Sequence, residues 1–147
     1  MQKVTTFLWF HSQAQEAARF YVSVFPGAKI VAEDTMSARF DLGGQQYIAF
    51  NGGDYYTLNP AVSLFVDCPT QAEIDSLWTR LLAGGGVESR CGWLVDKFGL
   101  SWQVVPAAVL ADTIGNPDPV KAQRAMGAMM TMAKLDIAAL EAARDGL

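Results

Sequence analysis

The sequence predicts an α+β fold made of two copies of one βαβββ module, followed by a helical extension. The first observation is an internal repeat: an offset of 57 residues places Glu16 on Glu73, and an offset of 55 places Asp41 on Asp96. The second is that each copy begins with a strand pattern followed by an amphipathic helix pattern. The third is a change to purely helical patterning after Pro106. We therefore expect a single domain over residues 1–147, with modules at 4–52 and 61–106 and an extension at 107–147.

The first copy reads as one strand, one helix and three further strands. Residues 4–10 are rich in β-branched and aromatic side chains, which favours a strand. Ser12 and Gln15 then form a capping-box pattern, and apolar residues at helical spacing predict a helix to about Phe25. Pro26 and Gly27 end that helix. Short strands are predicted over about 29–34, 37–42 and 46–50.

The second copy repeats this order with a shorter middle. Residues 62–66 are predicted to be a strand, and Thr70 with Glu73 forms a second capping box. The helix that follows ends at the glycines 84–86. Residues 87–90 fit either a short strand or a simple link. Residues 93–95 and 102–105 form a hairpin whose turn uses the positive φ available to Gly99.

The extension begins with a short helix over 107–113. Asp118 followed by Pro119 is typical of a helix start, because proline is tolerated at the first helical position. The helix beyond carries an apolar stripe with a break near Lys134. Methionines at this spacing pack against the core or a partner chain, or form a flexible lid. We favour packing, and expect a homodimer because the stripe is large for a monomer surface; the stripe comprises Met126, Met129, Met130, Ile137 and Leu140.

Composition limits the class of protein. Half of the 147 residues are apolar and 18% are charged, which is typical of a globular chain. The net charge of −4, without a run of Lys or Arg, argues against binding to nucleic acid. No apolar run reaches the ~20 residues of a membrane span, and the start is a poor secretory signal. Cys68 and Cys91 form no CxxC pair, so we expect reduced thiols and a cytoplasmic protein.

Several single residues allow both a functional and a structural interpretation. His11 follows the first strand, where it is either a general base near a cavity or an exposed loop residue. Asp96 is either functional or part of a turn. The two cysteines are either nucleophiles or buried thiols. Residues 54–56, Asp-Tyr-Tyr, lie on a loop where binding groups often occur. No catalytic residue is assigned.

The alternation of strand side chains predicts a ligand-binding face. If Gln103 faces a cavity, the residues of like parity on the other strands face it too. Phe7, Trp9, Tyr47 and Trp102 then belong to the core under the helices. The predicted lining of the cavity is mostly apolar with a few small polar groups, which suits an apolar small molecule. The predicted ligand-binding residues are Thr6, Leu8, Phe10, Ile48, Phe50, Ser63, Phe65 and Gln103.

Several motifs carry a family resemblance that covers nearly the whole chain. They include Phe7-Leu-Trp-Phe10, Asn51-Gly-Gly53, Cys91-Gly-Trp-Leu94 and Ser101-Trp-Gln-Val-Val-Pro106. With the duplicated βαβββ module, they resemble the PhnB-like, or 3-demethylubiquinone methyltransferase-like, family. That family belongs to the vicinal oxygen chelate superfamily, which has the glyoxalase/bleomycin resistance fold.

The resemblance implies a metal position that this chain fills poorly. Metal-dependent members of the superfamily hold a divalent ion with side chains from the first and last strand of each module. The corresponding positions here are Thr6, Ile48, Ser63 and Gln103, of which only Gln103 is a plausible ligand. We therefore expect no metal and no cofactor.

Three functions remain open. The first is a metal-free protein that binds an apolar small molecule. The second is a metal-dependent lyase, isomerase or dioxygenase of the same superfamily. The third is a methyltransferase acting on a quinone precursor, as the family label implies. The glycines at 84–86 and 52–53 lack the strand–loop–helix context that a dinucleotide-type or S-adenosylmethionine-type loop requires.

Overall fold

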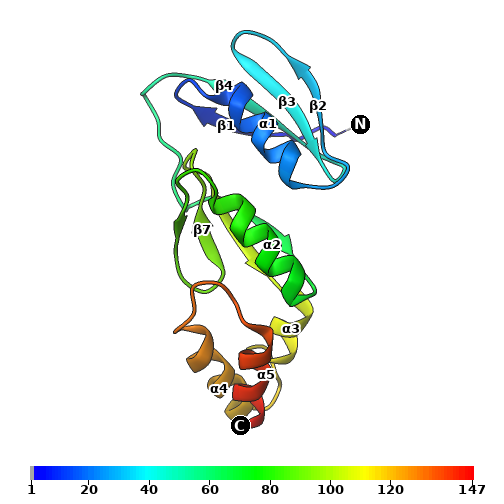
Figure 1. Cartoon of the computed structure of the whole chain (residues 1–147), viewed down its shortest axis with the longest axis vertical. Helices are drawn as coiled ribbons and strands as arrows, with labels where there is room; N and C mark the ends of the chain where they lie inside the picture. Colours follow the sequence, from blue (N-terminus) through cyan, green and yellow to red (C-terminus); the bar gives the residue numbers. More distant parts are fainter. Residues whose placement is uncertain (1) are drawn as a thin grey trace. The chain divides into compact units, whose positions relative to one another are not determined.

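The computed structural model describes residues 2–147 and divides the chain into two compact units (Figure 1). The first unit ends at Asn59, and the second spans Pro60–Leu147. Each unit contains one four-stranded sheet, and the two sheets have the same strand order. The predicted duplication of a βαβββ module, the α+β class and the helical extension are confirmed. The expectation of a single domain stays a prediction.

The first unit is built from β1 (Thr6–Phe10), α1 (Ala14–Val24), β2 (Lys29–Glu33), β3 (Ser37–Leu42) and β4 (Gln45–Asn51). The strands lie in the order β1-β4-β3-β2, with β1 parallel to β4 and the other pairs antiparallel. Helix α1 covers one face, where the ring of Tyr21 lies 5.8 Å from that of Phe40. Phe40 in turn stacks on Tyr47 at 5.4 Å. Among residues 2–59 no second helix covers the opposite face.

The second unit repeats the arrangement with β5 (Ser63–Asp67), α2 (Gln71–Leu82), β6 (Val87–Glu88), β7 (Trp93–Val95) and β8 (Ser101–Val105). Its strand order is β5-β8-β7-β6. Residues 87–90, which allowed a strand or a link, provide a strand of only two residues. Leu94, Trp102 and Val104 are buried on the face that packs against α2. Trp102 is therefore a core residue, as predicted.

The two helices of the modules begin in different ways. The predicted capping box of α2 is confirmed, because Thr70 Oγ1 accepts the amide of Glu73 and the Glu73 side chain accepts the amide of Thr70. The predicted capping box at Ser12 is wrong: Gln13 occupies the N-cap position and makes no side-chain cap. Asn51, at the end of β4, supplies the missing acceptor, since its Oδ1 accepts the amide of Ala14 at 2.7 Å.

The turn between β7 and β8 is organised by a buried carboxylate. Asp96 Oδ1 accepts the backbone amides of Phe98 and Leu100 at 2.8 and 3.0 Å. Its Oδ2 accepts the indole N–H of Trp102 at 2.8 Å. Asp96 is therefore part of the turn, which was one of the two interpretations of this residue. It also connects the turn to the core.

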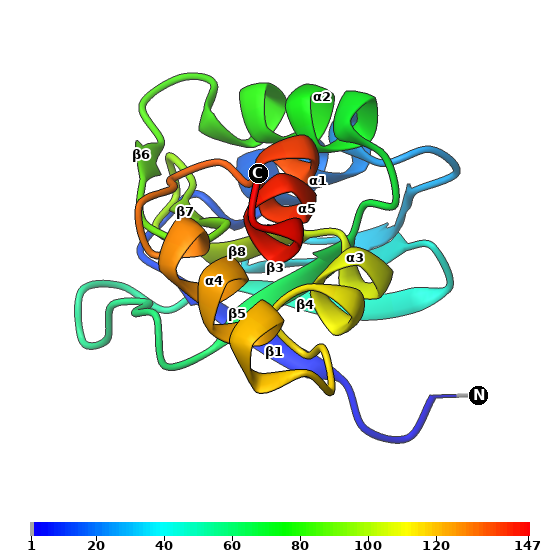
Figure 2. The ribbon, with the colours of Figure 1, turned by 90° about the horizontal axis from the view of Figure 1, so that it is seen from below.

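The extension contains α3 (Ala107–Asp112), α4 (Pro119–Met129) and α5 (Ile137–Asp145), and α4 packs side by side with α5 (Figure 2). The predicted break near Lys134 falls in the connection between α4 and α5. Gln71 of α2 holds this connection, because its side chain donates to Leu135 O and accepts from the amide of Ile137. Leu140 of the predicted apolar stripe is fully buried, whereas Met126 and Met130 of the same stripe are exposed.

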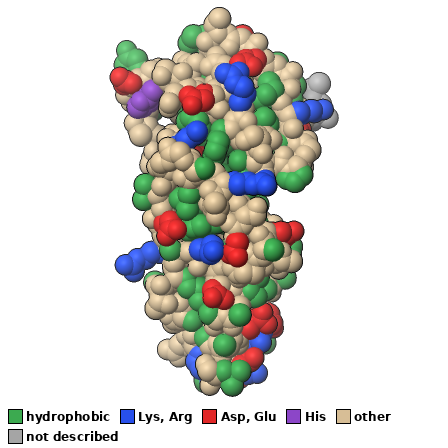
Figure 3. All heavy atoms as spheres, viewed as in Figure 1, with side chains coloured by type: hydrophobic (Ala, Val, Ile, Leu, Met, Phe, Trp, Pro, Cys, Tyr) green, Lys and Arg blue, Asp and Glu red, His purple; other side chains and the backbone are tan. Residues whose placement is uncertain are grey.

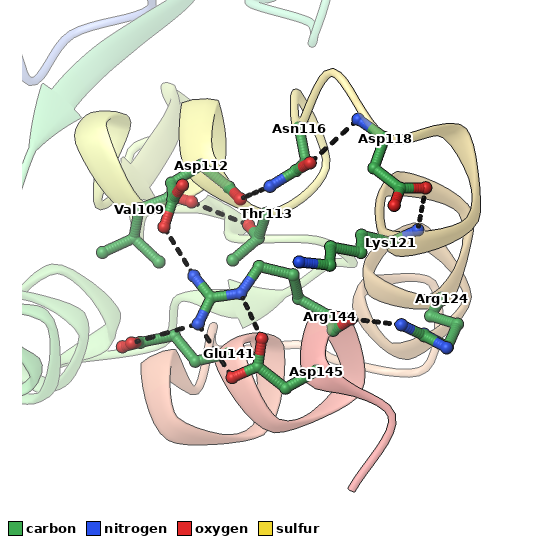
Figure 4. A network of polar contacts seen from close by, with 10 residues as sticks. All are labelled: Val109, Asp112, Thr113, Asn116, Asp118, Lys121, Arg124, Glu141, Arg144 and Asp145. Atoms are coloured by element: carbon green, nitrogen blue, oxygen red, sulfur yellow. Dashed lines mark hydrogen bonds and ion pairs between the residues drawn. The ribbon is translucent and has the colours of Figure 1, made fainter.

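Arg144 on α5 connects the three helices of the extension (Figure 4). Its guanidinium forms an ion pair with Asp112 at the end of α3, and its backbone carbonyl accepts from Arg124 of α4 at 2.8 Å. Asp145 bonds the same guanidinium and, with its other neighbours, raises the pKa of Arg144. The extension is thus held by charged contacts as well as by its own apolar core. No helix among residues 2–147 has the length and apolar character needed to cross a membrane.

Candidate functional site

The uncovered face of the first sheet is built by different residues of β1 from those predicted. In the parallel pair β1–β4, Phe7 lies opposite Ile48 and Leu8 opposite Ala49. Leu8 and Ala49 are buried, whereas Phe7 is 53% exposed. Thr6, Leu8 and Phe10 therefore share the helix-covered face, and their assignment to the ligand face is wrong. The placement of Phe7 in the core is wrong for the same reason, and Trp9 shares the face of Phe7.

The error has a clear origin in the repeat. The register places Phe7 opposite Ile48 in the first unit and Phe65 opposite Gln103 in the second. The first strands are thus related by an offset of 58 residues, 65 minus 7, and not by 57. A shift of one residue turns every side chain of a strand to the other face. Because Phe7-Leu-Trp-Phe10 is apolar at every position, alternation could not reveal the shift.

The remaining predicted residues of this sheet, Ile48 and Phe50, do lie on the uncovered face. The ring of Phe50 lies 5.2 Å from that of Phe7 and 5.4 Å from that of Trp9. Phe7, Ala32, Ile48 and Phe50 form the apolar part of a cavity of about 400 Å³. The cavity lies within the first unit and is lined by Phe7, Ala32, Glu33, Asp34, Ser37, Arg39, Ile48 and Phe50.

The rim of this cavity carries three charged side chains with different surroundings. Glu33 forms an ion pair of 2.6 Å with Arg19 of α1. Asp34 accepts the amides of Met36 and Ser37, each at 2.8 Å, and these bonds lower the pKa of its carboxyl. Arg39 makes no hydrogen bond or ion pair with any of residues 2–147.

The face of the second sheet opposite α2 brings together two of the predicted polar residues, Ser63 and Gln103. Gln103 Nε2 donates to Ser63 Oγ at 3.0 Å, which joins the first and last strands of the module. Phe65 lies opposite Gln103 and is 56% exposed. Trp93, which sequence reasoning did not assign to this face, pairs with Gln103 from the other side. The alternation within the hairpin could have identified it.

The superfamily's metal position does not fit the residues present. Thr6 lies on the helix-covered face of its sheet, and Ile48 has no donor atom. Ser63 Oγ already accepts from Gln103. Across residues 2–147 there is no group of three or more His, Cys, Asp or Glu side chains that could hold a metal ion. The donor set therefore offers one amide oxygen, which is too little for a divalent cation.

His11 lies at an exposed loop. Its Nδ1 is 3.3 Å from Asp54 Oδ1, and its Nε2 lies 3.2 Å from the carbonyl oxygen of Tyr56. Trp9 holds the same loop, since its indole donates to Gly53 O at 3.0 Å and its ring contacts Tyr56. These contacts give His11 and Asp54 a role in fixing the loop 51–57. Tyr55 and Tyr56 are both exposed.

The two cysteines belong to the second unit, and neither lines the cavity of the first. Cys68 is buried, and burial raises the pKa of its thiol to about 11. It is therefore protonated at neutral pH and a poor nucleophile. The thiol of Cys91 donates to Met129 O at 3.5 Å. The burial of Cys68 and the hydrogen bond of Cys91 both agree with cysteines that serve the fold.

A second and larger hollow, of about 690 Å³, lies between the β6–β7 connection and the α4–α5 connection. Most of its side chains are polar, and Glu88 accepts the indole N–H of Trp78. Sequence reasoning did not predict it, because it forms only where two distant connections meet. It is lined by Glu88, Ser89, Arg90, Met130, Thr131, Met132 and Ala133.

Charged side chains on the face shown in Figure 3 are mixed in sign, without a broad basic area. This pattern agrees with the acidic net charge of −4. It offers no electrostatic stripe of the kind that follows a phosphate backbone.

Comparison with known proteins assigns the family. The family model described as 3-demethylubiquinone-9 3-methyltransferase matches residues 2–105. The chain belongs to this family. A PhnB protein from Bacillus cereus, provisionally described as a 3-demethylubiquinone-9 3-methyltransferase, is 33% identical, with a TM-score of 0.64. The match covers 71% of this chain and 99% of that one. The predicted PhnB-like resemblance is confirmed.

More distant structures show the same fold. A glyoxalase-related enzyme from Fulvimarina pelagi is 16% identical, with a TM-score of 0.51 over 70% of this chain and 87% of that one. A glyoxalase/bleomycin resistance protein from Albidiferax ferrireducens is 12% identical, with a TM-score of 0.51 over 70% and 97%. A comparison with curated protein sequences gave no match. In this family member, α3–α5 lie beyond the residues that the family model matches.

Proposed function

We propose that this family member binds a largely apolar small molecule on the uncovered face of its first sheet, without a metal ion. The observation that carries the proposal is the cavity of about 400 Å³ over Phe7, Ile48 and Phe50. Small-molecule sites are typically concave, mostly apolar, and about 300–1,000 Å³ in volume. Phe7 is 53% exposed in this cavity, and exposed apolar surface of this kind is one mark of a ligand-binding groove.

The second sheet offers a polar ligand-contacting surface of its own. Gln103 and Ser63 form a hydrogen-bonded pair on the face that also carries the exposed Phe65. An amide can orient a neutral polar group on a ligand, because it offers both donors and an acceptor. We propose that Gln103, Ser63 and Phe65 contact a ligand on this face of the second sheet.

Methyl transfer, which the family description names, has less support in this chain. The glycines at 84–86 follow α2 and precede a strand of two residues, while those at 52–53 lead from β4 into a loop. Neither forms the strand–loop–helix turn that binds a nucleoside-type cofactor. The metal-dependent alternative also has less support, because Thr6 lies on the helix-covered face and Ile48 has no donor atom.

We also propose that the protein forms a homodimer. Met126 and Met130 remain exposed on the extension, as do Phe7 and Phe65 on the sheets. This support is narrower than the sequence suggested, because Leu140 is buried in the extension. Light scattering on the intact protein tests the proposal: a mass of two chains is expected, and a stable mass of one chain contradicts it.

The binding proposal is tested with N-phenyl-1-naphthylamine, a neutral apolar dye whose emission rises in apolar sites. The wild-type protein should bind it saturably. Phe7→Ala should weaken binding about tenfold or more, since burying a phenyl side chain is worth about 1.5–3 kcal/mol. The matched control is Tyr55→Ala, which removes an exposed aromatic residue outside the cavity lining.

Two results would contradict this proposal. One is the absence of saturable dye binding by the wild-type protein. The other is equal affinity in Phe7→Ala and wild type. Native mass spectrometry of gently purified protein, searching for a bound small molecule, gives an independent measurement of the ligand itself.

A further inference from the structure

We infer that the cavity of the first unit selects apolar molecules that carry an acidic group, and that Arg39 binds that group. The inference rests on the proposed function and adds the chemical class of the ligand. It depends on two observations. The guanidinium of Arg39 lies beside an apolar surface, and the neighbouring carboxylates of Glu33 and Asp34 already have partners.

The register fixes where Arg39 lies. Arg39 on β3 is directly opposite Ile48 on β4, and Ile48 is directly opposite Phe7 on β1. Residues paired across neighbouring strands point to the same face of a sheet. The guanidinium therefore extends over the same uncovered face as Phe7 and Ile48, and all three line the cavity.

The two carboxylates of the same cavity already have partners. Glu33 is paired with Arg19 at 2.6 Å. Asp34 accepts two backbone amides and the hydroxyl of Ser37, at 2.8, 2.8 and 3.2 Å. Neither carboxylate contacts Arg39. Within residues 2–147, Arg39 is thus the one charged side chain lining this cavity that has no internal partner.

An unpaired guanidinium beside an apolar floor favours one ligand chemistry. Arginine presents several N–H groups in a planar fork that matches the two oxygens of a carboxylate or sulfonate. The apolar floor of Phe7, Ile48 and Phe50 accommodates a ring or a short hydrocarbon. The volume of about 400 Å³ limits the ligand to a small molecule. An aromatic or aliphatic organic acid satisfies both parts of the cavity.

The test uses two dyes with the same aromatic skeleton and different charge. 1-Anilinonaphthalene-8-sulfonate carries a sulfonate, and N-phenyl-1-naphthylamine carries none. Wild-type protein should bind the sulfonate more tightly than the neutral dye. Arg39→Gln should weaken binding of the sulfonate about tenfold, the loss expected for one charge-assisted contact. The same substitution should leave binding of the neutral dye within about twofold.

Two further variants distinguish the effect of a charge at the site on dye binding from the effect of the protein's net charge. Lys29→Gln changes the net charge by the same amount on the same sheet, but Lys29 does not line the cavity. It should leave both dyes unaffected. Arg39→Lys should restore part of the preference for the sulfonate, because it keeps the charge and loses the fork. Thermal melts confirm that each variant is folded.

The outcomes separate this inference from the proposed function. Saturable binding of the neutral dye, without an Arg39-dependent preference for the sulfonate, overturns the inference and leaves the proposed function standing. An equal loss of both dyes in Arg39→Gln also overturns it. Failure of the wild-type protein to bind either dye overturns both proposals.

Discussion

The two modules share one topology but stabilise it differently. In the second, Asp96 is buried and connects the β7–β8 turn to the indole of Trp102. Its counterpart in the first, Asp41, is half-buried and, among residues 2–147, its side chain accepts only the turn amide of Gly44. Tyr47, the counterpart of Trp102, stacks on Phe40. The comparison indicates that a duplicated backbone can keep its strand order while one copy concentrates its stabilising contacts in a few buried residues.

The helical extension increases this difference. It packs on the second module through Gln71 and through backbone bonds from Cys91 and Gly92 to residues 132 and 133. Arg144 connects its three helices. The matched part of the chain, 2–105, ends where this extension begins. The second module therefore has support that the first lacks, and we expect the first to be easier to perturb by a bound ligand.

The largest expected effect comes from emptying the core site of the second module. Trp102 is 1% exposed, and Trp102→Ala should lower the free energy of unfolding by about 3–5 kcal/mol. Tyr47→Ala should cost less, because Tyr47 is only half-buried. Urea unfolding followed by circular dichroism measures both. An equal loss of unfolding free energy in the two variants would contradict the proposed difference in how the modules are stabilised.

The next effect concerns the two equivalent aspartates. Asp96→Ala leaves the indole N–H of Trp102 and the amide of Leu100 without their buried acceptor, and should cost about 2–3 kcal/mol. Asp41→Ala removes a single bond in an exposed turn, so it should cost less than about 1 kcal/mol. The comparison uses the same unfolding experiment. A cost for Asp41→Ala as large as that for Asp96→Ala would show that burial is not the deciding factor.

These particular residues also show how far the sequence can be used for prediction. The repeat predicted both modules, and the capping box at Thr70 predicted the start of α2, because those signals are local. Which side chains of β1 face α1 was not predictable, since Phe7-Leu-Trp-Phe10 is apolar on both faces of the strand. The cap that Asn51 provides for α1, and the burial of Asp96 against Trp102, depend on tertiary contacts. The cavity could be predicted only in part, since Ile48 and Phe50 were assigned and Arg39 was not.

A smaller effect is expected at the starts of the two helices. Asn51→Ala removes the only side-chain acceptor for the first turn of α1 among residues 2–147, and also a bond to Gln15. It should cost about 1–2 kcal/mol, at the upper end of the range for helix caps. Thr70→Ala removes the local cap of α2 and should cost about 1 kcal/mol. A negligible effect of Asn51→Ala would mean that water replaces the distant cap.

The smallest effect on folding, and the most informative for the site, is expected from Gln103→Leu. Leucine keeps a similar volume and makes the second module resemble the first, which has Ile48 at the equivalent position. Ser63 loses its donor, but it is only half-buried and can bind water instead. The free energy of unfolding should therefore change by less than about 1 kcal/mol. Affinity for a ligand whose polar group bonds Gln103 should fall about tenfold to a hundredfold, because that group is left unpaired. Calorimetry with a ligand identified by native mass spectrometry, beside urea unfolding of the same variant, measures the two effects separately. Unfolding of Gln103→Leu under native conditions would show that the Ser63–Gln103 pair serves the fold, and the proposed ligand contacts of the second sheet would then be wrong.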